Sequence, residues 1–503
     1  MNLRQTLIAA AIVPMMATAQ MEVVPQKLDN PSNAPLPCFP VPSERQIKWN
    51  ETEFYGFFHY GMNTYTGKEW GYGDEDENQF APTKVPNPRQ WLTVAKSAGM
   101  KGGIAVVKHH DGFCLWPTKT TEHNVTKSSN PNAQATNIPY SFGVAARELD
   151  MKYGFYISPW DRNSEKFAKD DYVTEVFLKQ CEECAEYGDD QFEMWFDGAN
   201  GGDGYYGGAR ENRSIDRDIY YDVFNLRPRI HRMAPDCVMW GVGGEARWIG
   251  NEAGWAGETN WATYDNGNGT DGNSGAPYGT EGSWRWNPGE SDAKATTLGW
   301  FWHNGEGVLG VERLFQMYLE TVGRNATWIL NLPPDQSGEL PKATVDRMEA
   351  FGKILKQRVT EHVDYAKSAN ITASATRKAG SNGASYTVAN LIDDNKETYW
   401  AIDDNQKSAT ITLQWAEPQN VHLVQLMEPI RLGQRIKKFS IEYSENGTDW
   451  KKVNCTTTTV GYKRIIPLNG NTASYGNGFN VRAIRISILD SRACPLLSNL
   501  SIF

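Results

Sequence analysis

Residues 193–202, EMWFDGANGG, contain the feature from which the fold can be worked out. The run Phe192–Phe196 has the composition of a buried strand, and it ends in a carboxylate, Asp197, followed by glycines. A packed strand can hold a carboxylate rigidly at its end, and the glycines leave room beside it for a substrate. Similar apolar runs occur before and after this one, so other strand ends can be searched for polar groups.

Short apolar runs alternate with amphipathic helices from about residue 50 to 358, which predicts a parallel sheet. We expect one further strand in the Gly-rich stretch 240–290. Eight strands favour an α/β fold of the TIM-like (β/α)8 barrel type over the doubly wound alternative. The strand candidates are YGFFHYG (55–61), GGIAVVKHH (102–110), YGFYISPW (153–160), FEMWFDG (192–198), CVMWGVGG (237–244), LGWFWHN (298–304) and TWILNLPP (327–334).

The two ends of the chain differ from this central region. After residue 358 the composition shifts to Thr, Ser, Asn and Val in short alternating runs, which is typical of an all-β sandwich. We therefore expect the barrel over residues 28–358 and the sandwich over 367–503. Residues 1–19 combine a positive charge, an apolar stretch and an Ala-Thr-Ala ending, which predicts a signal peptide and a periplasmic or extracellular protein.

Composition narrows the class of ligand. The net charge of −10 without any basic run argues against nucleic acid or an anionic membrane as a partner. The 18 tryptophans favour aromatic surfaces that stack on flat apolar faces such as those of sugars. The seven cysteines are too few for a disulfide scaffold, and Cys181 and Cys184 are expected to be ordinary helix or core residues.

Polar and aromatic groups stand at several of the predicted strand ends. Each of these groups, taken alone, could have a purely structural role as a helix cap or a core side chain. In a barrel, however, the carboxyl ends of all strands face one mouth, so these groups are expected to converge. They are His59, His109, His110, Trp160, Asp197 and, in a later loop, Glu252.

Two kinds of hydrolysis could use such a mouth. Glycoside hydrolysis needs two carboxyl groups on either side of the scissile bond. Metal-dependent hydrolysis needs three or more ligands, and the candidates would be His59, His109, His110 and Asp111. The many tryptophans and the expectation of a neutral substrate favour the sugar.

At this point the motifs resemble a known family. YGFFHYGMNTYTGKEWG, VVKHHDGFCLWPT, YGFYISPWDRN, EMWFDGANG, RWIGNEAGW and VGRNATWILNLPPDQSG follow the order and spacing of the α-L-fucosidases of glycoside hydrolase family 29. The NEAGW segment and the appended sandwich resemble the subgroup that prefers α-1,3/1,4-linked fucose. ASYTVANLIDDNKETYWAI and IKKFSIEYSENGTDWKKV resemble discoidin-like coagulation factor 5/8 type C domains, many of which bind carbohydrate.

The resemblance implies a retaining mechanism and a role for each matched residue. Asp197 matches the nucleophile. Glu252 matches the acid/base of the subgroup, and Glu245 is the nearest competitor. The implied fucose-binding residues are His59, Glu69, Trp70, His109, His110, Trp160 and Trp195, and either Trp300 or Trp302, of which we favour Trp302, is expected to supply the apolar wall for the C5 methyl group.

Partners and cofactors follow from the same reading. We expect fucosylated oligosaccharides or glycoconjugates as substrates, no catalytic metal or cofactor, and at most a structural calcium ion in the sandwich. The long Gly- and Trp-rich loops after the fifth strand are expected to wrap the second branch of a Lewis-type glycan. The alternative to an enzyme is a catalytically inactive glycan-binding protein that keeps the barrel as a scaffold.

Overall fold

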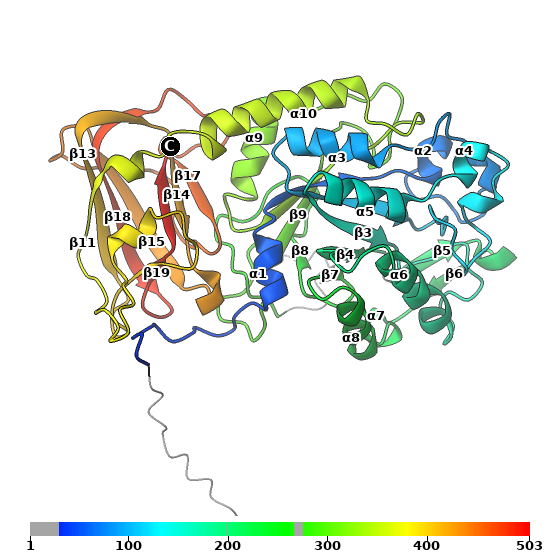
Figure 1. Ribbon diagram of the computed structural model, residues 1–503, viewed down its shortest axis with the longest axis horizontal. Coiled ribbons are helices and arrows are strands. Elements are labelled where there is room, and N and C mark those ends of the chain that lie inside the picture. Colours follow the sequence, from blue (N-terminus) through cyan, green and yellow to red (C-terminus); the bar gives the residue numbers. More distant parts are fainter. Residues whose placement is uncertain (1–29, 199, 266–274) are drawn as a thin grey trace, which may run out of the picture.

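The computed structural model describes residues 30–198, 200–265 and 275–503. Its larger part is a barrel of eight parallel strands in the order β7-β4-β3-β2-β1-β10-β9-β8 (Figure 1). A bridge between Trp240 and Ala246 closes the circle, so the predicted TIM-like fold is confirmed. The barrel strands are β1 (Phe54–Phe58), β2 (Gly102–Lys108), β3 (Lys152–Ile157), β4 (Glu193–Phe196), β7 (Val238–Gly241), β8 (Arg247–Trp248), β9 (Gly289–Lys294) and β10 (Thr327–Asn331).

Helices on the outside of the barrel bury their apolar faces against these strands. Helix α3 shows why they form where they do: the Asn87 side chain caps it by accepting a hydrogen bond from the Gln90 N–H, and Pro88 occupies its first turn. The helices are α1 (Glu44–Asn50), α2 (Met62–Thr66), α3 (Pro88–Ser97), α4 (Pro131–Gln134), α5 (Ile138–Glu148), α6 (Leu178–Ala185), α7 (Arg217–Tyr220), α8 (Val223–Met233), α9 (Val311–Glu320) and α10 (Lys342–Leu355).

One strand prediction was wrong. LGWFWHN (298–304) forms turns and irregular backbone, and the seventh barrel strand is β9, with the sequence GESDAK. This strand reads as polar because its carboxylates point into the protein: Glu290 accepts a hydrogen bond from Tyr55 and Asp292 accepts one from Trp248. The hydrogen bonds that make its burial tolerable come from residues far away in the sequence.

The C-terminal part is a sandwich of antiparallel sheets, as its alternating pattern predicts. Its core contains apolar side chains such as Trp400, Ile411 and Ile486, which are fully buried. The first sheet has the order β11 (Asn370–Ala373), β13 (Ala409–Val421), β18 (Phe479–Ser491), β15 (Ile436–Ser444) and β16 (Lys451–Lys452). The second has the order β17 (Arg464–Pro467), β14 (Leu423–Met427) and β20 (Asn499–Ile502), and β12 (Trp400–Ala401) pairs with β19 (Leu496–Leu497).

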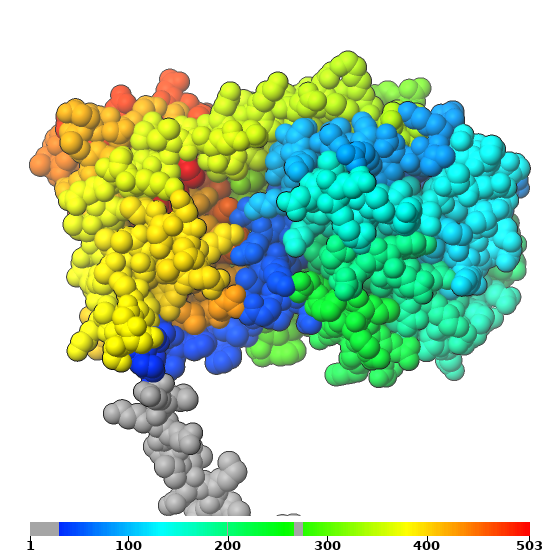
Figure 2. Space-filling model, in the orientation of Figure 1, coloured from blue at the N-terminus to red at the C-terminus, as the bar shows by residue number. Residues whose placement is uncertain are grey.

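The sandwich packs tightly on the barrel. Ala262 and Trp286, from the long loop between β8 and β9, lie in the interface: the N–H of Ala262 donates to Gln434 at 2.7 Å, and Trp286 packs in an apolar cluster with Met427 of the sandwich. The N-terminal segment 30–39 lies against the sandwich, where Arg435 donates to the carbonyl of Leu36. Figure 2 shows this blue segment and helix α1 in the seam between the two domains.

Three further points concern the whole chain. The expected signal peptide, residues 1–19, lies outside the described residues. Among the helices of the described part, none has the length and apolar composition needed to cross a bilayer. All seven cysteines are free thiols, and Cys181 and Cys184 are buried on α6.

Candidate active site

A pocket of about 440 Å³ opens at the carboxyl ends of the barrel strands. Nine of the ten site residues predicted from the sequence line it, namely His59, Glu69, Trp70, His109, His110, Trp160, Trp195, Asp197 and Glu252. Trp302 is the exception, because Trp300 supplies the indole in the pocket wall instead. The backbone of Trp300 is fixed on both sides, since its N–H donates to Glu69 and its carbonyl accepts from Asn331.

Asp197 follows β4 directly and lies within the pocket. Its Oδ1 accepts the Gly198 N–H at 2.7 Å, and its Oδ2 accepts the Tyr156 hydroxyl at 3.2 Å. Burial among the pocket rings raises the pKa of Asp197, and the charge of Glu252 adds to this, while the two hydrogen bonds act in the opposite direction. Gly198 has a φ of +69°, and a Cβ there would lie 2.4 Å from the His110 ring, so this turn requires glycine.

His59 and His110 are neutral acceptors in this pocket. Burial lowers the pKa of each imidazole to about 3. The Asn331 amide nitrogen donates to the Trp300 carbonyl, so Asn331 Oδ1 accepts from His59 Nδ1 at 2.8 Å. Ser158 donates its one proton to the Trp160 carbonyl, so it accepts from His110 Nδ1. In both rings Nε2 is therefore left unprotonated, and it can accept a hydrogen bond from a hydroxyl group.

His109 is held differently from its neighbours. Its ring stacks on Tyr156 with centroids 5.4 Å apart and an interplanar angle of 11°. Its buried Nδ1 has no hydrogen-bond partner within the described residues. Burial lowers the pKa of His109 well below its ordinary value, and the positive charge of Arg162 acts in the same direction. The ring is therefore neutral and is oriented by stacking.

Glu252, the predicted acid/base, lies in the loop after β8. Its side chain is exposed to solvent at the pocket, and its Oε2 accepts the indole N–H of Trp300 at 3.2 Å. A bridge between Ala253 and Ala293 holds this loop against β9. The competitor Glu245 lies elsewhere: it is buried, it bonds to His231 and to the N–H of Met239, and it does not line the pocket.

The metal-ligand alternative has little support in the geometry. Within residues 30–198, 200–265 and 275–503, no three His, Cys, Asp or Glu side chains are placed to hold a metal ion. Asp111, the fourth candidate ligand, accepts hydrogen bonds from Asn63 and from the N–H of Phe113. Both of its oxygens are thus bonded within the protein.

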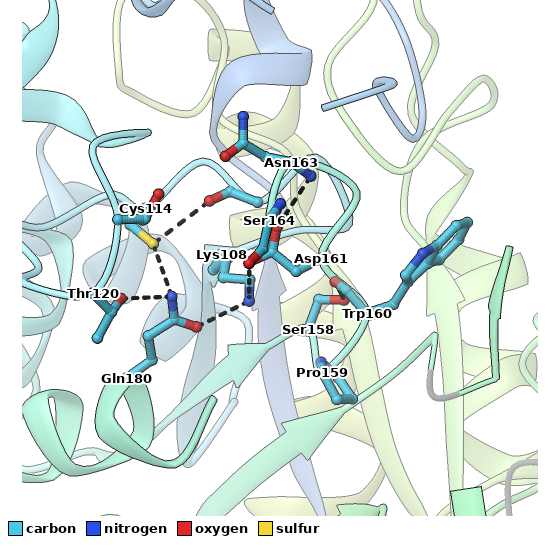
Figure 3. Close-up of polar contacts among 12 residues, drawn as sticks. Lys108, Cys114, Thr120, Ser158, Pro159, Trp160, Asp161, Asn163, Ser164 and Gln180 are labelled. Atoms are coloured by element: carbon cyan, nitrogen blue, oxygen red, sulfur yellow. Dashed lines mark hydrogen bonds and ion pairs between the residues drawn. The ribbon is translucent and has the colours of Figure 1, made fainter. Parts of the chain in front are cut away.

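A buried ion pair supports the floor of the site. Lys108, at the end of β2, lies 3.0 Å from Asp161 and donates to Gln180 at 2.9 Å (Figure 3). Asp161 also accepts from the N–H groups of Asn163 and Ser164. Because Lys108 precedes His109 and Asp161 follows Trp160, this pair fixes two pocket-forming segments relative to each other.

The pocket also contains residues that sequence reasoning missed. Tyr156 was hidden inside an aromatic strand, and Asp292 belongs to the strand that was not recognised. Phe57 was likewise hidden inside an aromatic strand, and the other four follow Asp197 in a segment without any hydrophobic period, which gave no signal. These missed lining residues are Phe57, Tyr156, Asn200, Asp203, Asn212, Arg217 and Asp292.

A TIM-like barrel with two carboxyl groups in one aromatic pocket is the arrangement expected of a glycoside hydrolase. The family model for α-L-fucosidase matches residues 41–359, more than half of the chain, and the model for the F5/8 type C domain matches residues 370–498. The chain therefore belongs to the α-L-fucosidase family. It is a glycoside hydrolase, its substrates are fucosylated glycans, and enzymes of this family need no cofactor for catalysis.

Individual relatives agree with this assignment. The chain is 32% identical over 476 residues to alpha-L-fucosidase 1 of Arabidopsis thaliana, covering 93% of this chain and 88% of that protein. It superposes with a TM-score of 0.81 on a GH29 fucosidase of Ruminococcus gnavus in complex with fucose, at 29% identity and covering 94% and 97% of the two chains. A glycoside hydrolase 29 family member from a rumen bacterium gives a TM-score of 0.78 at 34% identity, covering 93% and 78%.

Proposed function

We propose that this protein is a retaining α-L-fucosidase in which Asp197 is the nucleophile and Glu252 the acid/base. The observation that supports this best is that both carboxyl groups line the same pocket at the carboxyl ends of the barrel strands. Asp197 attacks the anomeric carbon of fucose while Glu252 protonates the departing oxygen. Glu252 then deprotonates the water that releases the sugar from Asp197.

The remaining pocket groups suit a deoxy sugar. The unprotonated Nε2 atoms of His59 and His110 accept hydrogen bonds from ring hydroxyls, which supports their role as fucose-binding groups. Trp300, rather than Trp302, offers the apolar surface for the C5 methyl group. Trp195 is held from behind by Trp240, with ring centroids 3.5 Å apart, so its position does not depend on the ligand.

The stereochemistry of the first product tests the mechanism. Proton NMR of the fucose released at early times should show the α anomer before mutarotation, since two displacements restore the starting configuration. Accumulation of a fucosyl-enzyme on Asp197, trapped with a 2-fluoro fucoside and found by peptide mass spectrometry, should accompany it. Initial release of the β anomer would contradict the retaining mechanism.

We further propose that the preferred substrates carry fucose in α-1,3 or α-1,4 linkage on Lewis-type branches. The support is the resemblance of the GNEAG segment to that subgroup. The loop 249–288, which was expected to wrap the second branch of the glycan, contributes only Glu252 to the pocket among its described residues. Ala262 and Trp286 of this loop pack on the sandwich instead. Relative kcat/KM values on α-1,2, α-1,3, α-1,4 and α-1,6 fucosides test the preference.

Two expectations about the rest of the chain stay proposals. We propose export through the signal peptide at residues 1–19, which N-terminal sequencing of the secreted protein would test. For the sandwich we propose carbohydrate binding and a structural calcium ion. A melting temperature lowered by a chelator and restored by calcium would support the ion.

A further inference from the structure

One wall of the pocket is a β-hairpin inserted between Asp197 and α8. Its strands are β5 (Gly201–Gly204) and β6 (Glu211–Ser214), and they pair so that Asp203 faces Asn212. Both of these side chains line the pocket, as does Arg217 of the following helix α7. Figure 1 shows the hairpin on the side of the barrel away from the sandwich.

The hairpin is anchored firmly to the barrel. Arg162, which is buried, donates through Nε to the Asp203 carbonyl and forms an ion pair with the Asp203 carboxylate at 2.9 Å. Arg213 donates to the carbonyls of Glu165 and Phe167. The strands are thus held from two sides before any substrate binds, so little conformational entropy would be lost when one does.

Close packing against Trp160 fixes the height of the hairpin above the site. A Cβ on Gly202 would lie 2.9 Å from the Trp160 ring, so the backbone lies directly on the indole. The indole N–H of Trp160 donates to Tyr206, whose hydroxyl donates to the Gly202 carbonyl. The polar side chains of the hairpin therefore have a defined position at the pocket wall.

These polar groups have no part in the proposed chemistry at the fucose ring. The side-chain nitrogen of Asn212 donates no hydrogen bond to any residue that the structure describes, although its oxygen accepts from Ser214 at 3.3 Å. In a pocket of about 440 Å³, within the range of roughly 300–1,000 Å³ that holds drug-sized ligands, a second sugar ring has room. That ring departs when Glu252 protonates its oxygen, so it must lie against the pocket wall beyond the fucose.

We propose that Asn212 of the β5–β6 hairpin and Arg217 of the following helix α7 form the binding subsite for the sugar that leaves. This inference rests on the proposed function. The ligand is a neutral sugar residue, because the amide and guanidinium N–H groups can donate to its hydroxyl or acetamido oxygens. The hairpin therefore determines which fucosides are cleaved quickly.

The test compares two substrates in three variants of the full chain. The substrates are 4-nitrophenyl α-L-fucoside and the fucosylated oligosaccharide that the wild type cleaves fastest, chosen from the linkage panel. Asn212→Ala and Arg217→Gln should each lose about tenfold more kcat/KM on the oligosaccharide than on the aryl fucoside, the effect of about one hydrogen bond. Glu211→Gln is the matched control, since Glu211 lies on the same hairpin, pairs with Arg213 and does not line the pocket.

A binding measurement supports the kinetics. In the Asp197→Asn background, calorimetric titration with the same oligosaccharide should show weaker binding for Asn212→Ala and Arg217→Gln than for Glu211→Gln. Equal losses on both substrates, or no loss on either, would overturn the subsite. A wild type that prefers α-1,2 fucosides would instead overturn the linkage proposal alone, because the hairpin comparison uses whichever oligosaccharide is cleaved best.

Discussion

Glu193 and Glu290 form a hydrogen-bonded pair of carboxyl groups inside the barrel, below the active site. Burial raises the pKa of both groups, and the charge of Glu290 raises that of Glu193 further. Because burial disfavours the charged form of each group and a second charge would be repelled by the first, the pair holds a shared proton. Trp195, which lines the pocket, donates its indole N–H to Glu290 at 2.6 Å. The pair therefore supports the pocket wall from below.

This arrangement predicts a loss of stability at alkaline pH. A carboxyl group with a raised pKa in the folded state contributes stability below its unfolded pKa, near 4.5, and loses it as the pH rises toward the folded value. Glu193→Gln replaces the shared proton with an amide donor that does not titrate. The variant should be more stable than the wild type at pH 8–9, by about 1–3 kcal/mol, the cost of one unsatisfied buried polar group.

Urea unfolding of both proteins at pH 5 and pH 9 would measure the effect. The difference between variant and wild type should grow with pH, since above the unfolded pKa the wild-type Glu193 must take up a proton on folding and the glutamine does not. Glu183→Gln serves as a control, because Glu183 accepts hydrogen bonds from Trp116 and Lys119 at the barrel surface, away from this pair. A stability difference that does not change between pH 5 and pH 9 would contradict a shared proton.

Replacement of Asp197 by Ala should abolish turnover with little effect on folding. Among the described residues the carboxylate accepts hydrogen bonds from the Gly198 N–H and the Tyr156 hydroxyl and lies 3.9 Å from His110 Nε2, so few contacts are lost. We expect kcat to fall by at least about 10³-fold, because the carboxylate that forms the covalent intermediate is removed. Steady-state assays with the aryl fucoside, and circular dichroism as a folding control, would show this. Retention of a tenth of the activity would exclude Asp197 as nucleophile.

The roles of Glu252 and Glu245 can be separated by chemical rescue. Glu252→Ala should slow substrates with poor leaving groups by about 10²–10⁴-fold, and aryl fucosides much less, because only the former need protonation as they depart. Added azide should restore turnover and give a fucosyl azide. Glu245→Ala should show lower stability without rescue, since it breaks the buried contact with His231. Rescue of the Glu245 variant alone would exchange the two assignments.

The sequence predicts strands and site residues correctly where the hydrophobic pattern reports burial. It fails where polar groups are buried together with their hydrogen-bond partners. Most barrel strands and the strand-end residues His59, His109 and Asp197 follow from alternation and from the common direction of parallel strands. Strand β9 was missed because Glu290 and Asp292 look solvent-exposed until their partners Tyr55 and Trp248 are known. Contacts between residues so far apart in the chain leave no local signal.

The absence of a local signal for long-range contacts also explains why the loops at the pocket rim were not predicted. The loop between β8 and β9 looked like a glycan-binding surface because it is rich in Trp and Gly, but Trp286 is buried against the sandwich. The hairpin that lines the pocket has a Gly-rich first strand, GGDG, without any alternation. Which of two polar loops faces a pocket depends on the packing of the second domain, and this is not encoded in local periodicity.

The buried ion pair of Lys108 and Asp161 should be tightly coupled. Lys108→Met leaves Asp161 charged without its partner in the interior, and it should destabilise the protein by roughly 3–5 kcal/mol. The double variant Lys108→Met/Asp161→Asn should lose less free energy of unfolding than the two single variants lose together, since no buried charge remains. Equilibrium unfolding of the four proteins gives the coupling energy. Additive losses would mean that the two side chains stabilise the floor of the site independently.

The last prediction concerns the pH dependence of activity. His59 and His110 have pKa values near 3, so they are neutral across the working range, and the acid limb should report Asp197. The Tyr156 hydroxyl donates to the Asp197 carboxylate and lowers its pKa. Tyr156→Phe removes this donor, so the pKa of Asp197 should rise and the acid limb of kcat/KM should move to higher pH.

The expected displacement is about one pH unit, corresponding to one hydrogen bond to a charged group of about 1.5 kcal/mol. Profiles of kcat/KM from pH 4 to 9 on the aryl fucoside would measure it. Tyr206→Phe is the matched control, because Tyr206 bonds to Trp160 and to the Gly202 carbonyl but not to Asp197. A Tyr156→Phe profile that is lower at every pH but not displaced would show that Tyr156 acts on substrate binding, and that another group sets the acid limb.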